Sequence, residues 1–500
     1  MCHGIVDVSG MSEKMMHSVK QFLTPDMRAF WVVCLAYVVF GGSRWFFGHV
    51  PGYMVFLVPI FLIIPLVRPK AGLWAIICLT VLFERFFTLE PLQFGRYALK
   101  LYPLDLVLLG MFGGVLVRIL AHRTKLFLDR SMLFLGIFFG IATLYFLASF
   151  LGFGERDLSV ALSTWKNYVF YGMLAVVLPQ VVVSKRDIRL TVKIFLWSVA
   201  LGLIFLVIGI ARGNGLWTEF TPLSTEGVRL LAFPHAFYFS LAVMTLLVSN
   251  DYWDPYRKSG FVWLLMGILM FGILSALMRH IWIGMLLAAG FAFLFFMRQE
   301  ARKKMIALSC IGIGVGTALF SGVLIIATLF PSLGVSRATN SIQAVVAERI
   351  ASIGSSADTS ISWRGTTWRS ALAEIEKHPL LGTGFGRHVA VEADAYHDFV
   401  EVRNIHNSWL ALFVQMGLLG GFAFVMAFSS VVLALVHLRP YGTLQHSMRV
   451  ALLSLLVYES LLMLAQPYLE TNLLNIPIWI TLGLALALVR VAQSNPALPA

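Results

Sequence analysis

The chain has 500 residues, of which 59% are hydrophobic and only 13% carry a charge. A typical soluble domain is about one-quarter charged, so this composition excludes an ordinary soluble protein. The formal net charge of +13 is compatible with nucleic-acid binding, but in a membrane protein Lys and Arg collect on the cytoplasmic side. We therefore expect a protein that contacts the lipid bilayer and binds no nucleic acid.

Apolar segments of helix length recur along the chain and predict an all-α, polytopic transmembrane helix bundle. A bilayer core needs about 20 apolar residues per helix, which gives about 12–14 spans here. The candidate spans in chain order are 29–46, 51–67, 71–88, 101–118, 131–152, 166–183, 190–211, 230–249, 260–277, 281–297, 305–330, 409–437, 447–466 and 471–492.

Positive charge marks alternate connections between these spans and so predicts the topology. Lys and Arg gather at 68–70, 118–130, 185–193, 257–258, 298–304 and 439–449, whereas the opposite connections are richer in Glu. The positive-inside bias then puts both termini in the cytoplasm and the long polar stretch 331–408 outside. No small-residue cleavage site follows residues 1–28, so we expect the first span to be an uncleaved anchor.

We expect one integrated domain with three parts. Residues 1–330 form an N-terminal transmembrane bundle, 331–408 form a large outside loop, and 409–500 supply the C-terminal transmembrane helices. Within the loop, Ser341–Ile353 and Thr366–Lys377 are predicted to be short helices. The second has an apolar face at helical spacing, so it would lie flat on the bundle or at the membrane interface, with Trp368 as its anchor.

Four cysteines occur in the chain, and none belongs to a CxxC motif: Cys2, Cys34, Cys78 and Cys310. The sequence therefore predicts neither a disulfide framework nor a zinc site. No set of His, Cys and carboxylate residues has metal-ligand spacing, and we expect no cofactor.

Two arginines at helix ends on the outside face are candidates for binding an anion. Arg279 joins two apolar segments, where it is either a snorkelling interface residue or a cation that faces a cavity. Arg229 precedes the span that begins at Leu230 and is either an ordinary helix-end arginine or a partner of Arg279. A shared anionic ligand would explain both, since guanidinium groups bind phosphate through two parallel hydrogen bonds.

His406 lies just before the span 409–437 and is a candidate general base, because a histidine titrates near neutral pH. The alternative is a surface histidine capped by Asn407. His280, His378, His388 and His397 are rivals on the same face. The glycine-rich segment 382–386 resembles a phosphate-binding loop, but it lacks the preceding strand and the downstream lysine. We interpret it as a turn that runs close to other backbone.

Two stretches together resemble the O-antigen ligase and O-antigen polymerase superfamily of bacterial inner membranes. The first runs from Arg364-Gly365-Thr366-Thr367-Trp368 to His378-Pro379-Leu380-Leu381-Gly382-Thr383-Gly384. The second runs from His406-Asn407-Ser408-Trp409-Leu410 to Gln415-Met416-Gly417-Leu418-Leu419-Gly420. Ser275, Arg279 and Gly284 resemble a third family motif, although the serine stands four residues before the arginine and not next to it. Arg229 followed by Phe233-Pro234-His235 resembles a fourth.

The resemblance implies a GT-C-like, metal-independent, inverting glycosyltransferase. The implied donor is a glycan on undecaprenyl pyrophosphate at the periplasmic face, and the acceptor is another glycan or lipid A-core. By the same resemblance Arg229 and Arg279 hold the pyrophosphate and His406 deprotonates the acceptor hydroxyl. Arg364 and Arg403 would add a phosphate contact or orient His406, with Asn407 and Trp368 in supporting positions.

Other functions remain open at the level of sequence. Ligase and polymerase need the same donor site and differ in their acceptor, so lipopolysaccharide and exopolysaccharide assembly both remain possible products of this site. A transporter or flippase of lipid-linked glycans would place polar groups at the midplane of broken helices. A purely structural assembly subunit would leave the outside arginines unexplained.

Overall fold

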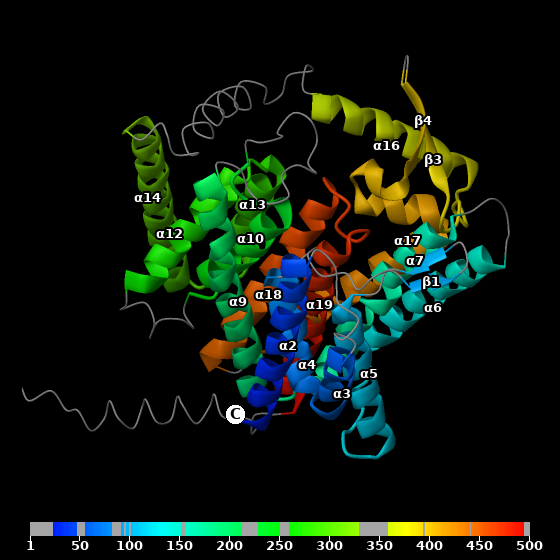
Figure 1. The fold of residues 1–500 in the computed structure, drawn as a ribbon, viewed down its shortest axis with the longest axis horizontal. Helices are drawn as coiled ribbons and strands as arrows, with labels where there is room; N and C mark the ends of the chain where they lie inside the picture. Colours follow the sequence, from blue (N-terminus) through cyan, green and yellow to red (C-terminus); the bar gives the residue numbers. More distant parts are fainter. Residues whose placement is uncertain are drawn as a thin grey trace, which may run out of the picture. The chain divides into compact units, whose positions relative to one another are not determined.

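The computed structural model describes residues 24–47, 56–82, 92–94, 97–99, 102–151, 157–212, 229–250, 260–329, 359–393, 396–440 and 442–494. These residues are mostly helical, which confirms the predicted all-α fold (Figure 1). The chain divides into two compact units, Met1–Leu126 and Phe127–Ala500. The predicted helix Ser341–Ile353 lies outside the described residues.

The first unit contains four described helices and one small hairpin. The helices are α2 (Pro25–Phe47), α3 (Val58–Val67), α4 (Pro69–Leu82) and α5 (Pro103–Leu120), and β1 (Leu92–Phe94) pairs antiparallel with β2 (Tyr97–Leu99). Helix α3 packs closely on α5 because Gly110 and Gly114 leave room for the backbone of Leu62 and Leu66. Small residues allow this kind of approach between membrane helices.

The second unit carries the predicted outside loop and the helices around it. Its elements are α6 (Arg130–Phe150), α7 (Leu158–Trp165), the π-helix η2 (Lys166–Phe170), α8 (Met173–Val181), α9 (Lys185–Arg212), α10 (Phe233–Val248), α12 (Gly260–Ser275), α13 (Arg279–Phe295), α14 (Gln299–Leu329), α16 (Thr359–Lys377), β3 (His388–Ala393), β4 (Tyr396–Glu401), the 3-10 helix η5 (Val402–Ile405), α17 (Ser408–His437), α18 (Gly442–Met463) and α19 (Asn472–Gln493). The predicted span 166–183 is thus divided into η2 and α8.

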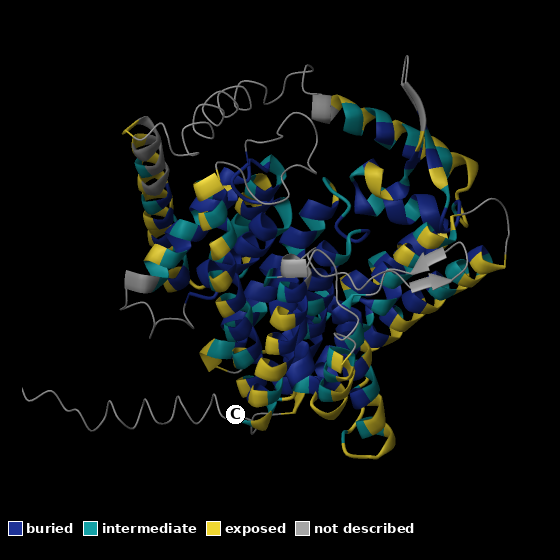
Figure 2. Cartoon of the chain, viewed as in Figure 1, coloured by how far each residue is buried: buried dark blue, intermediate teal, exposed yellow. Residues whose placement is uncertain are grey.

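Seven described helices are long and apolar enough to cross a membrane, and five shorter apolar helices accompany them. Burial separates inner from outer helices. In α19, 83% of the most apolar window is buried inside the protein, against 28% in α6, and the exposed residues of α6 are visible in Figure 2. Helix α19 packs against α8 and α18, so its apolar residues form the centre of the second unit.

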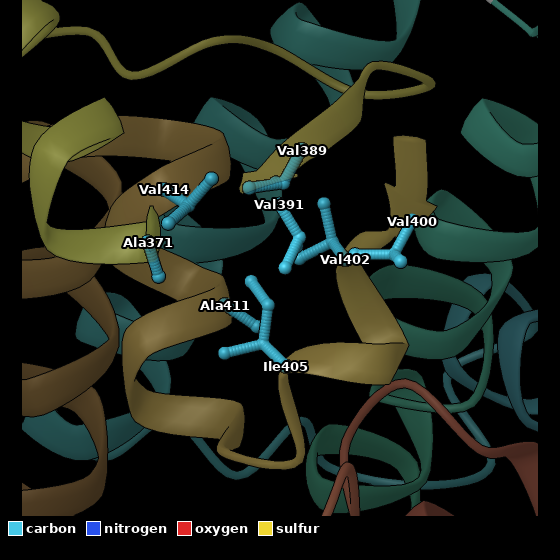
Figure 3. Close-up of a cluster of buried hydrophobic side chains, with 8 residues drawn as sticks. All are labelled: Ala371, Val389, Val391, Val400, Val402, Ile405, Ala411 and Val414. Atoms are coloured by element: carbon cyan, nitrogen blue, oxygen red, sulfur yellow. The ribbon is translucent and has the colours of Figure 1, made fainter. Parts of the chain in front are cut away.

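The predicted helix 366–377 is the second half of α16, and Ala371 on its apolar face is buried, whereas Leu372 is 49% exposed. Ala371 belongs to a buried cluster with residues of β3, β4, η5 and α17 (Figure 3). The antiparallel hairpin β3–β4 contributes Val389, Val391 and Val400 to this cluster. The helix therefore packs on the bundle, which is one of the two placements expected for it, and Trp368 packs against the same cluster.

Helix α17 is broken at Gly417, whose φ of 57° and ψ of −159° are not helical. The break frees backbone groups, and the glycine-rich segment binds them. Thr383 N donates to Val414 O at 2.8 Å and Gly384 N to Gln415 O at 2.9 Å, while Leu418 N donates to Pro379 O at 2.8 Å. Backbone groups at membrane depth must be satisfied by the protein itself. This segment therefore closes the break, as a turn that runs close to other backbone.

Candidate functional site

His406 connects η5 to α17 in a left-handed backbone conformation, with φ 56° and ψ 35°. Such a conformation in a residue other than glycine costs roughly 1–3 kcal/mol and is concentrated at functional sites. The ring Nδ1 lies 2.7 Å from the side-chain oxygen of Gln466, in the turn between α18 and α19. The structure thus holds this histidine in one strained position.

Residues on both sides of His406 fix that position. Trp368 Nε1 donates to the carbonyl oxygen of Ile405 at 3.0 Å, which ties η5 to α16. Asn407 is the N-cap of α17, and its side-chain oxygen accepts from Leu410 N at 3.1 Å. Asn407 therefore caps the helix and not His406, so the interpretation of His406 as a surface histidine capped by its neighbour does not describe this geometry.

A buried polar network supports the same end of α17. Glu470 accepts from the Tyr168 hydroxyl at 2.7 Å and from Ser408 Oγ at 2.6 Å. Asn167 Nδ2 donates to the carbonyl oxygen of Glu470 at 2.7 Å. Asn167 and Tyr168 belong to the π-helix η2, a distortion that is frequent at functional sites. The network joins α17, the turn before α19 and η2 into one framework beside His406.

Arg229 is buried, with only 5% of its surface exposed. The next residue, Leu230, donates its backbone N–H to Ser275 O at 3.3 Å, which holds this segment against the end of α12. A charge is costly to bury unless it is paired or hydrogen-bonded. Arg229 is therefore not an ordinary exposed residue at a helix end.

Arg279 is the first residue of α13 and follows a strained turn. Leu277 has a positive φ of 55°, so two of the three non-glycine residues with positive φ in the described chain, Leu277 and His406, lie at this site. The second residue of α13, His280, has its ring 5.6 Å from that of Phe233 at the start of α10. The N-terminal ends of α10 and α13 therefore meet.

Arg364, Arg229 and His406, from three different parts of the second unit, lie close enough to His280 to act on its ring. The hydroxyl of Tyr468 lies 3.3 Å from Nε2 of the same ring. The sequence interpretation named His280 only as a rival base, because nothing in the chain order shows that it stands between these residues. The structure thus brings together Arg229, Arg364 and His406, with Arg279 adjacent to His280.

Burial of the His406 ring lowers the pKa of this histidine below its ordinary value. The hydrogen bond with Gln466 raises the pKa and partly offsets the burial, whereas the charge of Arg364 lowers it further. The N-terminus of α17, where backbone N–H groups carry partial positive charge, also disfavours the protonated ring. The net effect favours the neutral ring, which is the form that can accept a proton.

The side chain of Arg403 pairs with a neighbouring carboxylate at the surface. Its guanidinium donates to Glu401 at 2.9 Å in an exposed contact, and the partner of His406 is Gln466. Sequence reasoning missed Gln466, because it stands 60 residues beyond His406 with no motif around it. Among the residues that the structure describes, no three His, Cys, Asp or Glu side chains form a group that could hold a metal ion.

Fold and site together define a multi-pass α-helical membrane protein in which cationic residues gather at the ends of helices. The family model described as O-antigen ligase matches residues 262–425, from α12 into α17, and this region contains Arg279, Arg364 and His406. The match confirms the predicted resemblance to the O-antigen ligase and polymerase superfamily. A comparison with curated proteins gave no significant match.

Proposed function

We propose that the chain is an inner-membrane glycosyltransferase of the O-antigen ligase or polymerase type. It transfers a glycan from undecaprenyl pyrophosphate to a sugar hydroxyl at the periplasmic face, in the assembly of lipopolysaccharide or another surface polysaccharide. The observation that carries this proposal is that Arg229, Arg364 and His406 lie around His280, where the starts of α10 and α13 meet through the ring contact of Phe233 and His280.

A pyrophosphate group suits this arrangement for two reasons. Guanidinium groups bind phosphate oxygens in pairs and keep their charge at any physiological pH. The first turn of a helix adds partial positive charge and unpaired backbone N–H donors. Arg229, Arg279 and Arg364 therefore stabilise the negative charge that grows on the leaving pyrophosphate. In this proposal the arginines do so without a metal ion.

His406 is the proposed base. It takes the proton of the acceptor hydroxyl while the acceptor oxygen bonds to the anomeric carbon of the donor sugar. The bond from that carbon to the pyrophosphate oxygen breaks, and its electron pair leaves with the pyrophosphate. Attack from the face opposite the leaving group inverts the anomeric configuration. A positioned base contributes about 10²–10⁴-fold to such a step.

The proposed orientation rests on the distribution of Lys and Arg. The alternation along the chain favours cytoplasmic termini and a periplasmic position for the loop 331–408. Arg229, Arg279, Arg364 and His406 then share the periplasmic face. A lipid-linked donor presents its pyrophosphate at that surface, so donor and cations lie at the same depth.

A transporter or flippase of lipid-linked glycans is the second candidate, and one observation favours it. Transporters use discontinuous membrane helices whose free ends bind substrate or ions, and α17 is discontinuous at Gly417. Here, however, the carbonyl oxygens of Val414 and Gln415 accept hydrogen bonds from the loop 383–384. These groups are used within the protein, which favours the transferase.

Alanine variants at three positions test the proposal by transfer assays with purified donor in liposomes. His406→Ala should abolish transfer while donor binding persists, and Arg229→Ala and Arg279→Ala should each weaken donor binding. His378→Ala and Arg369→Ala serve as matched controls, since both residues are exposed. Normal product from His406→Ala would show that His406 is not the base. Unchanged donor binding in an arginine variant would indicate that this arginine only anchors its helix at the membrane interface.

Two further measurements define the reaction. Chelator should leave the purified protein active, and inhibition that Mg²⁺ reverses would indicate a metal-dependent transferase instead. Deleting the gene and separating the surface glycans on a gel distinguishes the two transferases. Full-length lipid-linked polymer that is not transferred indicates a ligase, and a single repeat unit indicates a polymerase.

A further inference from the structure

The contact between His406 and Gln466 determines which nitrogen of the imidazole is available as a base. Nδ1 of His406 lies 2.7 Å from Oε1 of Gln466. An amide oxygen can only accept a hydrogen bond, so in this contact Nδ1 must carry the proton. In the neutral ring the other nitrogen, Nε2, then has a free lone pair. The pair therefore selects the tautomer in which Nε2 is basic.

Gln466 is itself held by the backbone of its turn. Its N–H donates to Leu462 O at 3.2 Å and its carbonyl oxygen accepts from Tyr468 N at 2.9 Å. The same carbonyl oxygen lies 3.3 Å from Ser408 Oγ, two residues after His406 in the chain. Because Ser408 also lies 2.6 Å from Glu470 Oε2, the turn 464–471 is attached to the start of α17. These hydrogen bonds therefore hold the side chain of Gln466 in position against the ring of His406.

We propose that Gln466 is a positioning residue that holds His406 in its Nδ1–H tautomer and directs Nε2 at the acceptor hydroxyl. This inference rests on the proposed function, since it gives His406 the role of base. In the transfer step the acceptor O–H proton moves to Nε2 while the acceptor oxygen bonds to the anomeric carbon. The imidazolium that forms keeps its Nδ1–H bond to Gln466 and later releases the Nε2 proton to water.

Other charged or titratable groups lie around His406 and also influence its protonation. Arg364 approaches from α16 and His280 from α13. Glu470 lies in the same turn as Gln466 and accepts a hydrogen bond from Ser408, two residues after His406. On the element of His406 itself, Arg403 and Glu401 pair with each other at the surface. A substitution at Gln466 leaves all of these groups in place.

Two substitutions of Gln466 shift the pH dependence of transfer in opposite directions. The base is active when deprotonated, so the rate rises with pH through the pKa of His406. Gln466→Glu keeps an acceptor opposite Nδ1 and adds a negative charge that favours the imidazolium. The acid limb should therefore move to higher pH by at least about one pH unit, the low end of the effect of a facing opposite charge.

Gln466→Leu removes the hydrogen bond and its stabilisation of the imidazolium. The acid limb should move to lower pH, and the plateau rate should fall by roughly 10- to 100-fold, part of what a positioned base supplies. Donor affinity should not change. The experiment measures initial transfer rates of the full-length protein in liposomes between pH 5 and 9, with donor affinity measured separately. Gln299→Glu, an exposed residue at the start of α14, controls for added charge.

The outcomes separate this inference from the proposed function. If His406→Ala is inactive and the two Gln466 variants shift the acid limb in opposite directions, Gln466 positions the base. If His406→Ala is inactive but both Gln466 variants keep the wild-type pH profile, Gln466 is only structural and the inference is wrong. If His406→Ala transfers glycan normally, the proposed base is wrong, whatever the Gln466 variants do.

Discussion

Substituting Gly417 tests whether the break in α17 holds the outside loop and the membrane helix together. The φ of 57° and ψ of −159° lie in a region that essentially only glycine occupies. A side chain would also meet backbone. A Cβ built on Gly417 comes within 2.6 Å of Gly382 N, and it approaches the carbonyl oxygen of Leu380 still more closely.

The expected cost of Gly417→Ala has two parts. Forcing alanine into this backbone region costs roughly 1–3 kcal/mol. The clash displaces Leu380 O, which accepts a hydrogen bond from Leu419 N at 3.2 Å, and losing such a bond costs about 0.5–1.5 kcal/mol. Together these give a loss of about 1.5–4.5 kcal/mol in the free energy of unfolding. Alternatively the helix becomes continuous and the loop 379–384 detaches.

Gly442→Ala is a matched control for this variant. Gly442 also has a positive φ, 78°, but nothing lies within 4 Å of its Cβ position. This control therefore carries the backbone cost without the clash. Equilibrium unfolding in detergent and amide hydrogen exchange of residues 379–386 measure both variants. If Gly417→Ala destabilises the protein no more than Gly442→Ala and leaves exchange of the loop unchanged, the break does not hold the loop.

Three other predictions follow from the site. Arg364→Gln removes a charge that lowers the pKa of His406, so the acid limb of the transfer rate should move to higher pH. An acid limb at the wild-type pH would mean that Arg364 does not influence the protonation of His406. Asn407→Ala removes the cap bond to Leu410 and should lower the free energy of unfolding by about 1 kcal/mol, measured by unfolding in detergent. Burial raises the pKa of Glu470, so folding binds a proton there and wild-type stability falls as pH rises above about 4.3. Glu470→Gln does not titrate, and its stability relative to wild type should increase with pH; a decrease would contradict this.

Hydropathy predicted the helices of this fold because membrane spans depend on composition more than on long-range contacts. The predicted span 409–437 corresponds to α17 almost residue for residue. Its length was itself a signal, since it exceeds the roughly 20 residues that a bilayer core needs, and the break at Gly417 explains the excess. The hairpin β3–β4 also had a signal in the alternation of Val389 and Val391, but short strands are harder to recognise beside strongly apolar helices.

The candidate site was only partly predictable. Arg229, Arg279 and His406 were found because charged or titratable residues at the ends of apolar spans are unusual. Nothing in the sequence placed His280 among the cations, since that depends on how α10, α13 and α16 pack. Gln466 is a single amide in an apolar region, and its contact is with a histidine in a left-handed conformation that no sequence motif announces. The contacts of His280 and Gln466 are made with residues far away in the sequence, so they depend on tertiary packing.

The break in α17 also reconciles the length of this helix with the thickness of a membrane. A continuous helix of 30 residues would be about 45 Å long, whereas the hydrocarbon core is only about 30 Å thick. The segment after Gly417 matches that core by itself, since 20 residues span about 30 Å. The segment before it, 408–416, is then free to take another direction. Its nine residues extend about 14 Å, so under the proposed function His406 would lie near the head-group layer that holds the pyrophosphate of the donor.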